Sequence, residues 1–455
     1  MTTIDAATPE SPLEALLRPL DVDLTRIVEL TNDFTETFTH LAAHSLDQFL
    51  ATPISESILR PAPGRDYGRG GTNLRVGFIE LSGAQDDRHL ERLLEQSWSI
   101  QNHLKSENSE SLFSWIGARI AEVVAKGCEA FNLPPTTPIP MGVTFSFPIH
   151  QSSLSEATLL PMGKGFAITS HLDLGAHLTR GYDQHRTPGL PPSASPPSPT
   201  TPLHPSKQPA AICVVPGDLA ADRVRIAVNT EWGINGTAPP LRRLGFVTRW
   251  DEALDAAGEA PGFQPLEYMT AGRYLGELAR LVFLEYLAAA EGVDAEVLPA
   301  GLRQRFGLTT TFASFVFPGG PRGPVVEQLG AEFPPAEGTG FRWTEAHGDA
   351  LHRIAKAIER RAAGIVAAAT VGLLRSAGEI PDQVTGGEVE ELVVGYTGGC
   401  IQYFQDYLKD AQGFLDGIME AYKPMRVRLS PCHDGGITGA GILVPAAMAG
   451  EEVRN

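Results

Sequence analysis

The stretch GRGGTNLRVGFIEL, residues 68–81, is a glycine turn that leads directly into an apolar strand. In such a turn, the backbone N–H groups of Gly70, Gly71, Thr72 and Asn73 could hold a phosphate group. A Gly-Gly pair is more often only a tight corner between two elements. The turn is therefore a candidate phosphate site that needs support from the rest of the chain.

The composition is that of a folded globular protein with two or three domains or two large lobes. The chain has 455 residues, of which 42% are hydrophobic and 20% are charged. Its formal net charge of −18 disfavours nucleic acid and anionic lipid surfaces as partners. It contains no apolar run of the roughly 18 residues that a membrane-spanning helix needs. The first residues carry acids and no basic cluster, so we expect no secretory signal and a cytoplasmic location.

The four cysteines are Cys128, Cys213, Cys400 and Cys432, which are far apart in the sequence and form no CxxC pair. This spacing argues against a disulfide framework and against a zinc site. We expect reduced thiols and no protein-ligated metal cluster.

Hydrophobic periodicity predicts an alternation of helices and strands along the chain. One amphipathic helix or two in tandem are predicted over residues 24–50, where Leu46 belongs to the apolar stripe. Helices are also predicted over 87–130, 264–290, 346–376 and 402–422. Strands are predicted over 74–81, 141–148, 224–228, 391–396 and 425–431. Strand, glycine turn and helix recur around residues 70, 398 and 435, which favours an α/β chain with more than one phosphate-facing turn.

Residues 187–206, TPGLPPSASPPSPTTPLHPS, form a proline-rich segment. Prolines cannot supply the N–H groups of a helix or a ladder, so we expect an exposed, extended linker at a boundary or an insertion.

Four residues are candidates for binding a polyhydroxylated ligand. Ser146 ends a predicted strand, and Lys164 follows within a Gly-Lys-Gly hinge. Glu231 lies just after a strand in NTEWG, and Glu267 lies in the first turn of a predicted helix. Carboxylates suit a sugar because each accepts hydrogen bonds from two hydroxyls. The plainer alternatives are a surface serine and lysine, and a glutamate that only complements a helix dipole.

The runs GGTNLRV, TFSFP followed by KGF, NTEWG and LEYMTAGRYLGELARLV resemble the hexokinase family, over about residues 24–443. The closing turns, VGYTGGC and CHDGGITGAGI, look more like the fungal N-acetylglucosamine kinase branch. The resemblance implies an α/β, two-lobed actin-like ATPase fold (ribonuclease H-like) that closes on a sugar. It also implies ATP and Mg2+ as cofactors, and transfer of the γ-phosphoryl group of ATP to the 6-hydroxyl of the sugar.

The resemblance implies a domain order as well: an N-terminal helical segment over 1–65, a small lobe over 66–180, the linker over 181–206 and a large lobe over 207–455. It places Ser146 and Lys164 on the sugar from the small lobe, and Glu231 and Glu267 on it from the large lobe. It assigns the phosphates to a first loop made of Gly70, Gly71, Thr72 and Asn73 with Arg75. It places Gly398 and Gly399 near the far end of the nucleotide.

The sequence departs from the family in its catalytic segments. The family's first loop reads Asp-x-Gly-Gly-Thr, but Gly68 stands in place of that Asp, and Asp66 lies two residues early. The family's Asn-Asp pair, whose Asp is the general base, and its Gly-Thr-Gly-x-Asn loop have no match, so no catalytic residue is assigned. A positioned base contributes about 10²–10⁴-fold in rate. We therefore expect impaired activity and infer an incomplete version of a kinase gene product.

Three interpretations remain open from the sequence: a hexose or hexosamine kinase, a non-catalytic sugar-sensing protein that keeps the sugar residues, and an α/β scaffold that binds neither ligand. The partner expected in the first two is a small-molecule sugar. The identity of the sugar and the oligomeric state are not fixed by the sequence.

Overall fold

The computed structural model describes residues 11–55, 73–80, 91–100, 104, 109–143, 149–151, 156–159, 172–192, 226–315, 323–382 and 389–431. The chain divides into two compact units. The first, here called the helical unit, consists of Met1–Leu41, Trp232–Val394 and Gly399–Leu429. The second, the mixed unit, consists of Ala42–Glu231, Gly395–Gly398 and Ser430–Asn455.

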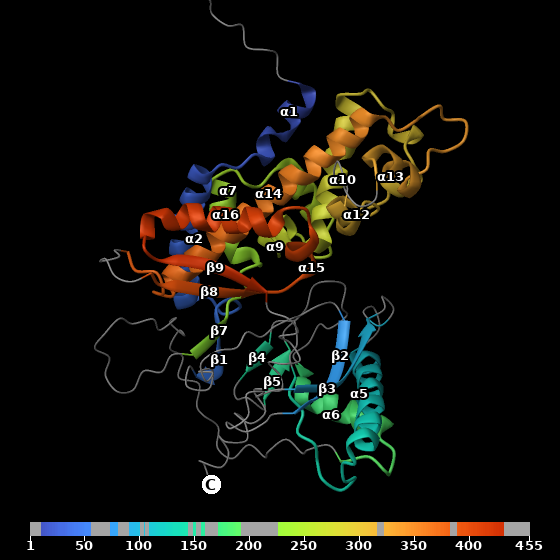
Figure 1. Cartoon of the computed structure of the whole chain (residues 1–455), viewed down its shortest axis with the longest axis vertical. Helices are drawn as coiled ribbons and strands as arrows, with labels where there is room; N and C mark the ends of the chain where they lie inside the picture. The colour runs from blue at the N-terminus through green and yellow to red at the C-terminus, as the bar shows by residue number, and fades with distance from the viewer. Residues whose placement is uncertain are drawn as a thin grey trace, which may run out of the picture. The chain divides into compact units, whose positions relative to one another are not determined.

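The helical unit is built around two long helices, α10 and α14, which pack against each other (Figure 1). Its core contains fully buried aliphatic and aromatic side chains from both helices, among them Phe283 and Ile354. The helices of this unit are α1 (Pro12–Leu17), α2 (Leu24–His44), α7 (Ala238–Arg243), α8 (Arg249–Ala256), α9 (Pro265–Thr270), α10 (Gly272–Ala289), α11 (Ala300–Arg303), α12 (Thr310–Phe315), α13 (Val325–Glu332), α14 (Glu345–Ser376), α15 (Gly399–Tyr403) and α16 (Tyr407–Met419). Short 3-10 turns lie at η1 (Arg18–Leu20), η2 (Asn235–Thr237), η3 (Ala295–Val297) and η4 (Glu420–Tyr422).

Small residues let other helices approach α14 closely. A Cβ on Gly372 would lie 2.9 Å from Cβ of Phe34 and 3.2 Å from the backbone of Thr31 on α2. A Cβ on Gly364 would lie 2.6 Å from Ile27 of α2 and 3.4 Å from Phe414 of α16. Such distances leave no room for a methyl group, so these glycines set the spacing of three helices.

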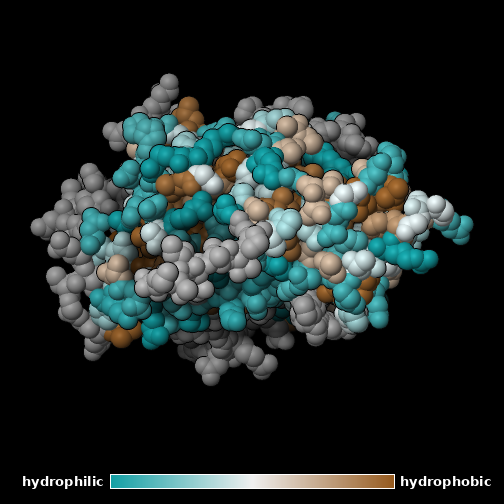
Figure 2. All heavy atoms as spheres, turned by 90° about the horizontal axis from the view of Figure 1, so that it is seen from above, coloured by the Kyte–Doolittle hydropathy of each residue, from teal (hydrophilic) through white to brown (hydrophobic). Residues whose placement is uncertain are grey.

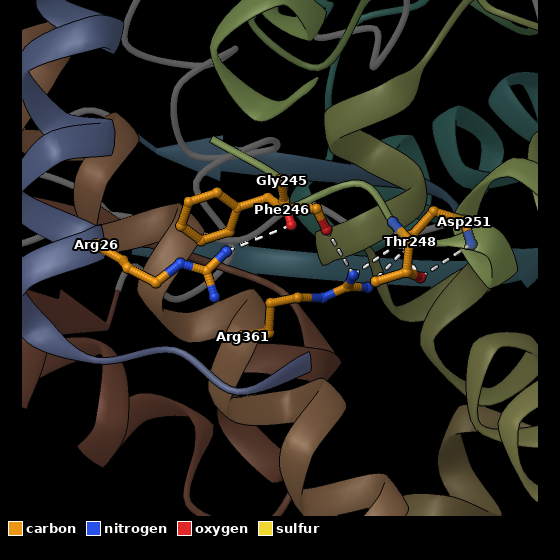
Figure 3. Close-up of polar contacts among 6 residues, drawn as sticks. All are labelled: Arg26, Gly245, Phe246, Thr248, Asp251 and Arg361. Atoms are coloured by element: carbon orange, nitrogen blue, oxygen red, sulfur yellow. Dashed lines mark hydrogen bonds and ion pairs between the residues drawn. The ribbon is translucent and has the colours of Figure 1, made fainter. Parts of the chain in front are cut away.

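A buried ion pair ties the middle of α14 to α8 (Figure 3). Arg361 is 0% exposed, and its two terminal nitrogens donate to the carboxylate oxygens of Asp251 at 2.7 and 2.8 Å. Arg361 also donates to the carbonyl of Phe246 at 3.0 Å, and Asp251 accepts from the backbone N–H of Thr248, the residue that caps α8. The guanidinium of Arg26, from α2, stacks on the Phe246 ring at 4.8 Å. One bidentate pair thus fixes the relative position of α8 and α14.

A two-stranded sheet consists of β8 (Glu391–Tyr396) and β9 (Arg426–Pro431). Gln412 of α16 donates to the Val427 carbonyl at 2.9 Å and accepts from the Leu429 N–H at 2.9 Å. The Arg428 guanidinium pairs with the Glu391 carboxylate at 2.9 Å across the two strands. The predicted strands over 391–396 and 425–431 are confirmed.

The described part of the mixed unit contains three small antiparallel sheets and two helices. Strand β1 (Leu50–Ser55) pairs with β7 (Ile226–Asn229), and β2 (Asn73–Glu80) pairs with β3 (Glu91–Ser99). A third sheet consists of β4 (Ile149–Gln151), β5 (Ala157–Leu159) and β6 (Leu172–Asp173). The helices are α5 (Ser109–Phe131) and α6 (Leu174–His185).

Helices α5 and α6 cross with their backbones in direct contact. A Cβ on Gly117 of α5 would lie 2.0 Å from the carbonyl carbon of Gly181 on α6. A Cβ on Gly181 would lie 2.3 Å from the carbonyl oxygen of Phe113. This crossing buries Phe113, Leu178 and other apolar residues in the core of the mixed unit.

Several sequence predictions are confirmed and four are wrong. The helix over 346–376 and the strand over 74–81 are confirmed as α14 and β2, to within one residue at each end. The predicted helix over 87–130 is wrong in its first part, because residues 91–99 form β3, which pairs residue for residue with β2 along most of its length.

The predicted helix over 264–290 breaks at Ala271, which is extended with ψ of 140°. The predicted helix over 402–422 is likewise split into α15 and α16. The helix over 24–50 ends at His44, and Leu46 is 94% exposed instead of lying in the apolar stripe.

Hydrophobic residues on the face drawn in Figure 2 form separate spots among hydrophilic ones. None of the helices in the described ranges is both long enough and apolar enough to cross a membrane.

Candidate functional site

Glu231 follows β7 and has an unusual backbone conformation. Its φ is +42°, in the left-handed region that non-glycine residues seldom adopt. Gln48, which is 1% exposed, donates its amide to the Glu231 carbonyl at 3.0 Å. Asn229, at the end of β7, donates to Glu231 Oε1 at 2.9 Å. Two side-chain amides therefore hold both the strained backbone and the carboxylate of Glu231 in place.

Glu267 lies in the first turn of α9, as the sequence predicts. Gln264, the residue before the first helical position, donates its amide to Glu267 Oε2 at 2.6 Å. Pro265 fits the first helical position because it needs no hydrogen bond there. The break at Ala271 separates this short helix from α10, and it is the reason that Glu267 does not belong to a long helix.

Gly233 connects the backbone after Glu231 to Glu267. The Glu267 N–H donates to the Gly233 carbonyl at 3.4 Å. A Cβ on Gly233 would lie 3.6 Å from Cβ of Glu267 and 3.8 Å from its Oε2. Gly233 therefore packs directly against Glu267 within the helical unit.

The surroundings of Glu267 are aromatic and buried. Tyr268 and Tyr274 meet edge to face with their ring centroids 5.0 Å apart. Burial raises the pKa of Tyr274 to about 12, and the Glu267 charge adds to the rise. Burial also raises the pKa of Tyr268, whose hydroxyl donates to the Ala260 carbonyl at 3.1 Å. Both phenols therefore stay neutral beside Glu267 at neutral pH.

The second predicted glycine turn, Gly398–Gly399, joins β8 to α15. Gly398 has a φ of +130°, and among the described residues nothing lies within 4 Å of a Cβ built on it. The requirement for glycine at this position is conformational, since the space above it is open. Open space of this kind beside a backbone fits the approach of a phosphate or another anionic group.

Arg75 and Asn73 belong to strand β2, and the guanidinium of Arg75 lies 3.9 Å from the Glu95 carboxylate of β3. The other predicted residues, Ser146, Lys164, Gly70, Gly71 and Thr72, lie outside the described residues, as do residues 434–443. Glu231 belongs to the mixed unit and Glu267 to the helical unit. All the site assignments stay predictions.

Within the described ranges, no group of three or more His, Cys, Asp and Glu side chains is arranged to hold a metal ion. Cys128 and Cys400 are free thiols.

Sequence reasoning missed the amides that hold the two glutamates. Gln264 precedes Glu267 by three positions at a helix start, a local spacing that could have indicated a side-chain contact. Gln48 contacts Glu231 across 183 positions, and no sequence signal pointed to it.

The fold is that of the hexokinases. The structure superposes on the hexokinase from Schistosoma mansoni complexed with glucose with a TM-score of 0.70, covering 95% of this chain and 98% of that one at 20% identity. A second solved hexokinase gives a TM-score of 0.64 over 96% of this chain and 98% of its own, also at 20% identity.

The chain belongs to the hexokinase family. Two sequence profiles described as hexokinase match it, one over residues 12–195 and the other over 206–446. Hexokinase-1 from Arabidopsis thaliana is 27% identical over 404 residues, which cover 82% of this chain and 77% of the relative. Hexokinase-7 from Oryza sativa subsp. japonica is 28% identical over 411 residues, which cover 83% of each.

Proposed function

We propose that this protein transfers the γ-phosphoryl group of ATP, with Mg2+, to the 6-hydroxyl of a hexose or an N-acetylhexosamine. The observation that supports the proposal most is the hexokinase family match on both sides of the proline-rich segment. The amide-held glutamates Glu231 and Glu267 supply the carboxylates that such a substrate needs. A carboxylate has about four acceptor positions, so the Asn229 amide does not exhaust those of Glu231.

The proposal extends to residues whose roles come from the family resemblance. Ser146 and Lys164 bind the sugar together with the two glutamates. Gly70, Gly71, Thr72 and Asn73, with Arg75, hold the phosphates, and Gly398 and Gly399 lie near the far end of the nucleotide. Phosphoryl transfer depends mainly on positioning and charge stabilisation, which backbone donors and Mg2+ can supply.

The test is a coupled assay of ADP release by the purified full chain with glucose, mannose and N-acetylglucosamine. We expect turnover with at least one sugar, at a rate reduced by the missing base. Glu267→Gln should weaken sugar binding about 10- to 100-fold, because a charged hydrogen bond contributes about 1.5–3 kcal/mol. Glu285→Gln, on α10 and paired with Arg249, is the matched control and should leave sugar binding unchanged. Equal affinity in the Glu267 variant and the wild type would argue against the assigned sugar residue.

The sugar is proposed from the closing turns of the sequence. VGYTGGC and CHDGGITGAGI favour N-acetylglucosamine over glucose. A higher kcat/KM for N-acetylglucosamine in the same assay supports this choice, and a preference for glucose contradicts it.

A second candidate function is sugar sensing without catalysis. The sequence-based expectation that favours it is that the family's catalytic Asn-Asp pair and Gly-Thr-Gly-x-Asn loop have no match in this chain. Sugar binding tighter than millimolar by calorimetry, with no ADP release, would select this candidate. If neither sugar nor ATP changes the unfolding temperature, the remaining interpretation is an α/β scaffold that binds neither ligand.

A further inference from the structure

Glu359 of α14 is a fully buried carboxylate that shares one ammonium group with two other carboxylates. Its side chain is 0% exposed. Lys356 Nζ lies 2.7 Å from Glu359 Oε2, 2.7 Å from Asp410 Oδ2 and 3.1 Å from Asp406 Oδ2. Asp406 precedes α16, and Asp410 lies in its first turn. With Glu359 ionised, three negative charges and one positive charge leave the group with a net charge of −2.

The second oxygen of Glu359 is buried and unsatisfied. Among the described residues, Oε1 has no hydrogen-bond partner. An ionised carboxylate that has lost its water without gaining a donor is strongly destabilised. The ionised form of Glu359 therefore opposes the packing that buries it.

The other titratable groups that face Glu359 do not compensate its charge near neutral pH. Burial raises the pKa of Cys400, on α15, to about 12, and the Glu359 charge contributes. Burial raises the pKa of Tyr407, on α16, well above its usual value. Partial burial alone would lower the pKa of Lys356, but hydrogen bonds to Asp410 and Glu359 outweigh it, so Lys356 stays charged.

The net effect falls on Glu359 itself. Burial raises its pKa to about 7, against the hydrogen bond and charge of Lys356, and the charges of Asp410 and Asp406 add to the rise. The pKa of Asp406 is held low by its hydrogen bond to Lys356 and by the Lys356 charge. Glu359 is therefore a carboxyl whose charge changes near neutral pH.

The same group contributes to the position of α15 and of the residues that follow it. A five-residue helix is too short to hold its own conformation, so its position depends on tertiary contacts. Several contacts place the segment 399–410, here called the α15–α16 corner, and Phe404 and Tyr407 of this segment are buried in the core of the helical unit. Cys400 packs against Gly272, where a Cβ would lie 3.0 Å away, and Gln405 donates to the Ala313 carbonyl at 3.4 Å. A further contact is the Lys356 bridge to Asp406 and Asp410.

We propose that Glu359 is a proton switch for the α15–α16 corner. With the proton bound, the corner docks on α14. With the proton lost, the corner opens often enough for water to reach the carboxylate. The consequence for ligands rests on the proposed function: Gly399 begins the corner, so nucleotide affinity falls as pH rises through neutrality.

The direction follows from where the proton binds more tightly. The docked corner holds the proton with a pKa of about 7, whereas a solvated glutamate has a value of 4.5. Opening therefore becomes more favourable as pH rises from 4.5 to 7 and levels off above 7. By linkage, the opening equilibrium should increase about tenfold between pH 6 and pH 8.

Hydrogen–deuterium exchange of the full chain without ligand, read by mass spectrometry, tests the switch directly. Exchange of peptides from the α15–α16 corner is compared at pH 6 and pH 8 after correction for intrinsic exchange chemistry. We expect about tenfold less protection at pH 8 in the wild type. Equal corrected protection at the two pH values would overturn the proposal.

Variants identify the titrating group. Glu359→Gln is neutral at both pH values and should remove the difference. His352→Gln should retain it, which matters because His352 acts on Asp406 by charge. Glu285→Gln, on α10 of the same unit, should also retain it. A pH effect that persists in Glu359→Gln, or disappears in His352→Gln, counts against Glu359.

A second variant covers the case in which Glu359→Gln does not fold. The Asp410 charge raises the pKa of Glu359, so Asp410→Asn should move the midpoint of the exchange transition to lower pH. An unmoved midpoint contradicts the proposed charge coupling.

Titration with Mg-ATP at the two pH values separates this inference from the proposed function. We expect weaker binding at pH 8 in the wild type than in Glu359→Gln, and equal binding by the two proteins at pH 6. If the corner responds to pH through Glu359 but ATP does not bind, the proposed function fails and the switch stands. If ATP binds with the same pH dependence in both proteins, the link between the switch and the nucleotide fails.

Discussion

At the scale of single residues, the candidate site combines side chains that the sequence indicates with supports that it hides. Glu231 and Glu267 could be selected because a carboxylate after a strand and another in a first helical turn suit a polyol. The positive φ of Glu231 could not be foreseen, because nothing in NTEWG demands it and the Gln48 amide that stabilises it comes from a distant segment. Strain of this kind persists only where the surroundings impose it, and it is concentrated at functional positions.

Gly398 provides a test of backbone conformation without steric crowding. Replacing it with alanine adds a Cβ that meets nothing within 4 Å, but the φ of +130° is unfavourable for any L side chain. We expect Gly398→Ala to destabilise the protein by about 1–3 kcal/mol in urea unfolding. Gly413→Ala is the matched control, because Gly413 lies inside α16 with open space around it and should gain about 0.5–1 kcal/mol. Equal effects of the two substitutions would mean that the backbone of Gly398 adapts.

The Arg361–Asp251 pair tests a buried charge. Arg361→Met leaves the Asp251 carboxylate, which is 3% exposed, without its bidentate partner. We expect a loss of about 3–5 kcal/mol in the free energy of unfolding. The double variant Arg361→Met, Asp251→Asn should lose less than the sum of the two single variants, because it leaves no unpaired charge. Additive losses would show that the two side chains are not energetically coupled.

At the scale of secondary-structure elements, local patterns predicted the long helices but not the points where they break. Leucines 90, 93 and 94 fit a helical spacing, yet β3 forms because β2 offers it a ladder of backbone partners. Tertiary pairing thus overrode local periodicity. The break at Ala271 is equally invisible in the apolar stripe of 264–290, although it decides that Glu267 begins a separate short helix.

The α5–α6 crossing tests the requirement for glycine at a helix contact. A methyl group on Gly117 would overlap the backbone of Gly181, which cannot move without shifting α6. We expect Gly117→Ala to destabilise the mixed unit by about 3 kcal/mol, at the upper end of the range for overpacking. Gly189→Ala, in the same unit with nothing within 4 Å, should change stability by less than about 0.5 kcal/mol. Thermal unfolding of the two variants compares them directly. Similar melting temperatures would show that α5 and α6 can move apart with little loss of stability.

At the scale of the whole molecule, the sequence predicted the family and its fold from a few short motifs spread along the chain. It could not predict the charge group around Lys356, because that group joins residues of α14 to residues about 50 positions later. The local signal is only a Lys and a Glu three positions apart in an alanine-rich helix, a spacing that is common on exposed helix faces. Burial turns the same pair into a group that affects the stability of the entire chain.

Glu359 should make global stability depend on pH. Its pKa is raised by burial to about 7 in the folded chain, from 4.5 when solvated, so the folded state binds this proton more tightly. The resulting stabilisation is fully present below pH 4.5 and is lost as pH rises to about 7, by at most about 3 kcal/mol. Glu359→Gln lacks this dependence, so its stability relative to the wild type should increase between pH 5 and pH 8. Urea unfolding of both proteins across that range measures the difference, and a constant difference would place the titration elsewhere.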